Sequence, residues 1–143
     1  MNAVRCLPLM FALMLSGCGL SVESGSAQNC FKDVFQQPVP AGVSSLQGSR
    51  DGYRDETVYL RFRASQPVLL KLVGPQVHFV SRGFGGLEGG GNPPAWWHPT
   101  AGNPTMFAAT TSALRDPSFA QGKAYMTYDP KTQIASVYSY GWD

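Results

Sequence analysis

The sequence predicts a single α+β domain: a small antiparallel sheet of four or five strands packed against one helix. Three segments support this prediction. Residues 57–63 alternate apolar and polar side chains, residues 66–73 are apolar between helix start and stop signals, and residues 123–140 have the pattern of two strands joined by a turn. The chain of 143 residues is long enough for one domain, and 43% hydrophobic and 12% aromatic content exclude wholesale disorder.

The segment Thr57–Arg63 has the period of a strand with one buried face. Every second position is apolar: Val58, Leu60 and Phe62. The positions between them carry larger polar groups: Tyr59, Arg61 and Arg63. Two interpretations of this second set stay open. It is either a solvated face or a surface whose arginines contact a ligand.

The other elements are predicted from local signals. Ser65 and Pro67 favour the start of a helix over residues 66–73, and Gly74-Pro75 ends it. Strands are expected at 123–129 and 133–140, with the turn at 129–132, and shorter ones around 43–46, at 77–80 and at 105–111. Residues 31–35 suggest a short turn of helix, and residues 112–119 a loop or helical turn broken by Pro117.

The first seventeen residues have the organisation of a secretory signal peptide. Arg5 supplies a positive start, the ten residues of 6–15 carry no charge, and small residues follow. A membrane-spanning helix is the competing interpretation, but it needs about 20 apolar residues to cross the hydrocarbon. The apolar segment is half that length, which favours a signal peptide.

The end of this segment, Leu15-Ser16-Gly17-Cys18, resembles the lipobox of bacterial lipoproteins, and the resemblance covers about the first twenty residues. It implies that residues 1–17 are removed, that Cys18 carries a diacylglyceryl group and an acyl chain, and that the membrane is a partner through this lipid. Gly19 is not the aspartate that retains enterobacterial lipoproteins at the inner membrane, so the resemblance implies the outer membrane, facing the periplasm. The alternative is a plain signal peptide with an incidental cysteine.

We therefore expect three regions: a signal peptide over 1–17, a flexible tether over 18–29 made of small and polar residues, and a domain over 30–143. The domain resembles small bacterial lipoproteins in general character, without a motif of a named domain family. Since Cys6 leaves with the signal and Cys18 carries lipid, Cys30 has no intramolecular partner for a disulfide. A buried thiol is favoured over pairing with a partner protein.

Charge and motifs exclude several functions. Without Arg5, ten basic residues face nine acidic ones, a net charge of +1 that gives no case for nucleic acid. The glycine-rich residues 82–94 are not a nucleotide loop, because Glu88 stands where the third glycine is needed and Pro93-Pro94 follows. We predict a surface loop there, no cofactor and no metal site, since His78 and His98 are twenty residues apart. No motif nominates a catalytic residue.

Trp96, Trp97 and His98 form the main candidate site outside the anchor, with Arg61 and Arg63 as further candidates. The tryptophans either form an exposed ledge for a glycan, peptide or lipid headgroup, or fold back over the sheet and cap its core. Two functions follow. The favoured one is a non-enzymatic binding or scaffolding lipoprotein with an envelope protein or glycan as partner. The alternative is an envelope enzyme, or an inhibitor of one, that uses residues 96–98 as its cleft.

Overall fold

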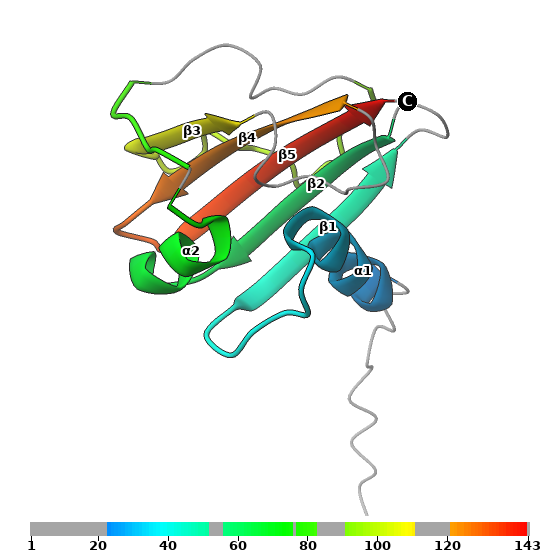
Figure 1. The fold of residues 1–143 in the computed structure, drawn as a ribbon, viewed down its shortest axis with the longest axis horizontal. Coiled ribbons are helices and arrows are strands. Elements are labelled where there is room, and N and C mark those ends of the chain that lie inside the picture. The colour runs from blue at the N-terminus through cyan, green and yellow to red at the C-terminus, as the bar shows by residue number, and fades with distance from the viewer. Residues whose placement is uncertain (1–22, 52–55, 76, 83–90, 111–120, 143) are drawn as a thin grey trace, which may run out of the picture.

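The computed structural model describes residues 23–51, 56–75, 77–82, 91–110 and 121–142 (Figure 1). Within them the chain forms one antiparallel sheet of five strands and two helices, so the predicted α+β class is confirmed. The elements are, in chain order, α1 (Glu23–Phe35), β1 (Ser44–Asp51), β2 (Glu56–Arg63), α2 (Gln66–Val73), β3 (Met106–Thr110), β4 (Gln121–Asp129) and β5 (Ile134–Trp142).

The strands lie in the order β1-β2-β5-β4-β3, which places the C-terminal strand at the centre of the sheet. β5 pairs with β2 on one side, from Glu56↔Gly141 to Arg63↔Ile134, and with β4 along its whole length on the other. β1 and β3 are the edge strands. Val80 forms an isolated bridge with Phe107 of β3, so the strand expected at residues 77–80 is reduced to this one bridge.

Both helices cover the same face of the sheet, which we call the helix face (Figure 1). Its core contains the apolar set of β2 predicted from the sequence, Val58, Leu60 and Phe62, all buried. Phe62 packs edge-on against Phe31 and Phe35 of α1, with ring centroids 5.6 and 5.9 Å apart. The rings therefore join α1 to the sheet through apolar contact rather than through polar groups.

Helix α1 corrects the predicted boundary between tether and domain. Residues 23–29 were expected in the tether, but they form the first two turns of the helix, and Ala27 is only 3% exposed. Gly48 of β1 lies beneath it: a Cβ there would come within 2.7 Å of the Ala27 backbone, so only glycine permits this approach. The described part of the domain thus includes residues 23–29, and the predicted signal peptide and Cys18 lie outside the described residues.

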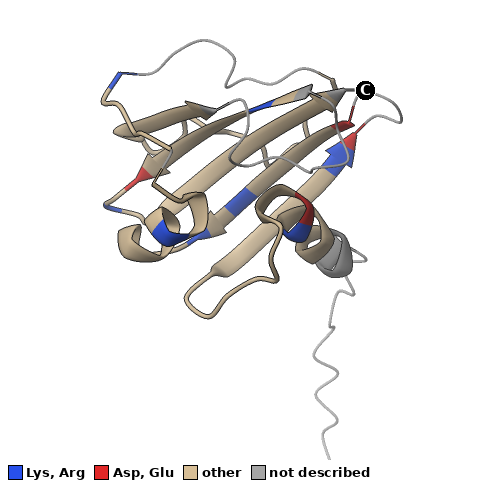
Figure 2. Cartoon of the chain, viewed as in Figure 1, with Lys and Arg blue, Asp and Glu red and all other residues tan. Residues whose placement is uncertain are grey.

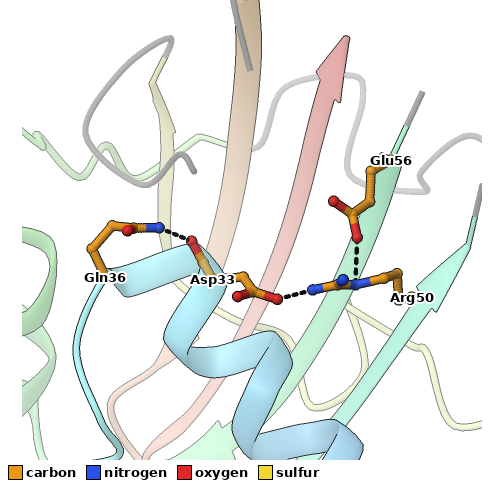
Figure 3. Close-up of polar contacts among 4 residues, drawn as sticks. All are labelled: Asp33, Gln36, Arg50 and Glu56. Atoms are coloured by element: carbon orange, nitrogen blue, oxygen red, sulfur yellow. Dashed lines mark hydrogen bonds and ion pairs between the residues drawn. The ribbon is translucent and has the colours of Figure 1, made fainter. Parts of the chain in front are cut away.

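A polar contact also holds α1 in place at its exposed side (Figure 3). The Arg50 guanidinium of β1 forms ion pairs with Asp33 of α1 and with Glu56 of β2. The Gln36 side chain donates a hydrogen bond to the Asp33 carbonyl and covers the last turn of the helix. Because the arginine is 42% exposed, this network adds little stability and mainly fixes the orientation of the helix.

The remaining elements agree with the local signals. α2 spans the predicted residues, with Ser65 at the N-cap position and Gly74 ending the helix at φ +77°, although the Ser65 side chain makes no capping hydrogen bond. The predicted hairpin is formed by β4 and β5. Its turn is stabilised by Asp129, whose carboxylate accepts hydrogen bonds from the Lys131 backbone N–H and the Thr132 hydroxyl. These bonds hold the pKa of Asp129 below its usual range.

Among the described residues, neither α1 nor α2 has the length and hydrophobicity that a membrane-spanning helix needs. The predicted loop at 112–119 and most of the glycine-rich stretch lie outside the described residues.

Candidate functional site

The face of the sheet opposite the helices carries a row of tyrosines. Tyr59 of β2 pairs with Tyr138 of β5, and Tyr138 pairs in turn with Tyr125 of β4. Cross-strand partners project from the same face of a sheet, so the three rings lie side by side across the three central strands. Tyr59 and Tyr138 are 5.5 Å apart between centroids, and Tyr125 and Tyr138 are stacked at 6.0 Å.

The two predicted-site tryptophans lie over this row. Trp97 packs edge-on against Tyr59 at 5.2 Å and is 6% exposed, and Trp96 packs edge-on against Trp97 at 6.2 Å. We call this surface the aromatic face, and it comprises Tyr59, Trp96, Trp97, Tyr125, Tyr138 and Tyr140. Since Trp97 is buried, it belongs to the aromatic core, whereas Trp96, Tyr125 and Tyr140 are only partly buried and form its rim.

The segment that carries the tryptophans, residues 91–104, has no helix or strand of its own and is fastened to the sheet at three strands. The Asn92 backbone N–H donates to the Asp51 carboxylate of β1 at 2.7 Å. The Arg61 guanidinium of β2 donates to the Trp96 carbonyl at 3.5 Å. The Thr127 hydroxyl of β4 donates to the Pro99 carbonyl at 2.7 Å, at a buried position. These bonds satisfy backbone groups that a loop over a sheet would otherwise leave unpaired.

Electrostatics keep Tyr59 protonated. Burial, then the neighbouring Tyr138 and the Asp51 carboxylate, raise the pKa of Tyr59 to about 12. All three causes disfavour the charged phenolate. At neutral pH the Tyr59 hydroxyl is therefore protonated and uncharged.

One polar atom of this face is left without a partner. The Trp97 indole nitrogen is buried, and no hydrogen-bond acceptor among the described residues reaches it. A buried donor in this condition costs about 1–3 kcal/mol relative to a paired one. The aromatic face thus contains an N–H group that an acceptor, such as a water molecule, would stabilise.

The structure brings some of the predicted site residues together. Arg61 is half-buried and contacts the Trp96 backbone, so these two candidates meet. His98 is exposed beside the buried Trp97. Arg63 is exposed at the last position of β2, two residues beyond Arg61 on the same face. Cys18, the candidate lipid attachment site, lies outside the described residues.

The row of tyrosines was not predicted from the sequence. Tyr125 and Tyr138 lie in the strands predicted at 123–129 and 133–140, but they were not assigned to a face, and Tyr59 was placed on a face that is solvated or binds a ligand. Tyr59 is instead completely buried. The two-residue spacing of Tyr138 and Tyr140 in the second predicted hairpin strand was the available signal, because residues two apart share a face.

Among the described residues no group of three or more histidine, cysteine, aspartate or glutamate side chains lies close enough to hold a metal ion. Cys30, a residue of α1, carries a buried thiol and is 1% exposed. Comparison with protein-family models, curated proteins and solved structures finds no match to this chain.

Proposed function

We propose that the chain is a lipid-anchored lipoprotein of the bacterial cell envelope, attached through Cys18, whose domain is a non-enzymatic binding or scaffolding module. The lipobox-like Leu15–Cys18 segment supports the attachment, and the absence of an aspartate at residue 19 favours the outer membrane, facing the periplasm. A protein or glycan of the envelope is the proposed partner, bound at the rim of the aromatic face.

The observation that carries the attachment is the position of Cys18 relative to the fold. The first described element begins at Glu23, so cleavage before Cys18 removes no residue of any helix or strand that the structure describes. The remaining 126 residues (143 − 17) contain the whole described domain. Diacylglyceryl and acyl chains together provide the two or more hydrocarbon chains that stable anchoring requires.

The binding surface is supported by the arrangement around Trp96. A half-buried tryptophan beside an exposed histidine and a half-buried arginine offers apolar area together with hydrogen-bond donors. Aromatic and arginine side chains of this kind dominate the energetics of many binding surfaces. Trp97 and the tyrosines beneath provide the rigid support that such a surface needs.

The attachment is tested by the intact mass of the protein extracted from bacterial membranes, measured beside Cys18→Ala. We expect the mass of residues 18–143 plus a diacylglyceryl group and one acyl chain, and loss of this modification in the variant. An unmodified mass with both proteins soluble would contradict the anchor.

The binding surface is tested by photo-crosslinking in intact envelopes. A crosslinker at His98 should capture an envelope component, and Trp96→Ala should weaken the capture. A crosslinker at Lys131, in the β4–β5 turn, is the matched control and should capture less. If the purified protein shows catalytic turnover, and Trp96→Ala abolishes this turnover without unfolding the protein, the result would instead favour the alternative function as an envelope enzyme.

A further inference from the structure

Two grooves lie on the helix face, on either side of the segment that follows α1. One of about 300 Å³ lies along α1 and is lined by Gln28, Asn29, Lys32, Pro38 and Val39. The other, of about 200 Å³, lies along α2 and is lined by Gln37, Pro40, Ala41, Val68, Lys71 and Leu72. Residues 37–41 contribute to both grooves, so the two grooves are neighbours on the surface of the domain.

This surface combines basic and apolar groups. Each groove includes one exposed lysine, Lys32 or Lys71, and Figure 2 shows a basic residue on each helix. Neither lysine forms an ion pair with a described residue, whereas the Asp33 carboxylate nearby is already paired with Arg50. Leu70 of α2 is 43% exposed, one of the two large apolar side chains that the described residues expose most.

The proposed anchor limits how far this surface stands from the bilayer. Only four residues separate Cys18 from the start of α1 at Glu23. Even a fully extended chain spans at most about 18 Å over these five steps. Gln28, the first residue of the α1 groove, lies only about 7.5 Å further along the helix axis. A lipidated Cys18 thus keeps the α1 groove close to the headgroups.

We propose that the helix face docks on the phospholipid bilayer, with Lys32 and Lys71 at anionic headgroups and Leu70 in the interface. This inference rests on the proposed lipid anchor. Cationic side chains are attracted to anionic lipid surfaces, and exposed apolar side chains beside them add to the binding. Because residues 91–104 cover the opposite side of the sheet, this orientation turns Trp96 and His98 away from the membrane.

The experiment uses the full-length lipidated protein, reconstituted in vesicles of phosphatidylethanolamine and phosphatidylglycerol. A fluorophore is attached at Gln66→Cys, on the exposed surface of α2, and in a matched control at Ala101→Cys, in the segment over the aromatic face. Cys30 is 1% exposed and should not react in the folded protein. Phospholipids with brominated acyl chains quench a fluorophore that reaches the interface.

We expect the brominated lipid to lower the emission at residue 66 roughly twofold and to leave residue 101 nearly unchanged, as for a face seated in the headgroup region. Lys32→Glu combined with Lys71→Glu should reduce the quenching at residue 66. Equal quenching at the two positions would overturn the proposal. It would also be overturned if residue 66 is shielded in intact envelopes but not in vesicles, because that result indicates that a protein partner covers α2.

The mass of the same reconstituted sample separates the two proposals. A lipidated mass with no preferential quenching at residue 66 overturns the docked orientation and leaves the anchor standing. A mass without lipid overturns the proposed function, and the orientation with it.

Discussion

The two faces of the sheet are covered in different ways. On the helix face, regular elements contribute apolar side chains at helical and strand periods, and Phe31, Phe35 and Phe62 pack together with no polar atom. On the aromatic face, an irregular segment contributes Trp97, and backbone hydrogen bonds to three strands hold it down. The packing of the helix face depends on burial of aliphatic and phenyl groups. The packing of the aromatic face depends on a few aromatic rings and on hydrogen bonds to the backbone of residues 91–104.

The largest effect should come from the helix face. Phe62→Ala removes a fully buried ring that contacts two residues of α1, and we expect a loss of about 3–5 kcal/mol in the free energy of unfolding. Chemical denaturation measures it. Leu70→Ala, at an exposed position of α2, is the control and should cost about 0.5 kcal/mol or less. Similar losses for the two variants would show that the aromatic contacts do not join α1 to the sheet.

The aromatic face should respond less to the loss of its central ring. Trp97→Ala should lower the free energy of unfolding by about 2–4 kcal/mol, because an irregular segment relaxes into the vacated space more easily than a helix does. Trp97→Phe keeps most of the ring and removes the unpaired N–H, so it should cost about 1 kcal/mol or less. A negligible effect of Trp97→Ala would contradict its role in covering the sheet.

On the helix face, the backbone of α1 also lies very close to the backbone of β1. Gly48→Ala places a methyl group 2.7 Å from the Ala27 backbone, so α1 must shift away from β1. We expect a loss of about 1–3 kcal/mol, measured by thermal or chemical denaturation. Ser49→Ala, the next position of the same strand, is the control and should be nearly neutral. Equal values for the two variants would mean that α1 does not pack on β1 at this point.

The smallest effect should appear only at high pH. Tyr59 has a pKa of about 12 in the folded protein against 10 in the unfolded chain, so the folded state holds its proton more tightly. The stabilisation is complete below about pH 10 and declines as the pH rises towards 12, by on the order of 1–2 kcal/mol. Tyr59→Phe should flatten this decline in a series of denaturation curves. If Tyr59→Phe leaves the decline in stability unchanged, the decline belongs to other tyrosines. Tyr128 is one of them, because burial also raises its pKa.

The contrast between the helix face and the aromatic face explains which parts of the fold the sequence predicts well. Elements of the helix face have local signals: the strand predicted from the alternation at 57–63 and the predicted bounds of α2 are both confirmed. α1 also has a helical pattern, with apolar residues at Ala27, Cys30, Phe31, Val34 and Phe35. The domain was nevertheless predicted to begin at residue 30 and the helical turn at residue 31, because Ser24, Gly25 and Ser26 have the composition of a linker. Packing against β1 overrides this weak local preference.

The aromatic face shows where local patterns are insufficient. The alternation at residues 57–63 identifies two sets of side chains but does not indicate whether a distant segment covers the second set. Tyr59 is buried because Trp97, 38 residues later, packs on it. The hydrogen bond from Arg61 to Trp96 spans 35 residues. Contacts at such separations depend on the complete fold, so the sequence offered both interpretations of the tryptophans without deciding between them.

The central position of β5 has a consequence for the order in which the protein folds. β1 and β2 can pair as soon as both are available, and so can β3 and β4, but only β5 joins the two pairs. Until residues 134–142 arrive, each pair lacks its main neighbour, and two short hairpins are marginal on their own. Completion of the sheet therefore waits for the C-terminal strand. A chain that is exported before it folds would keep its two halves unjoined until this strand has crossed the membrane.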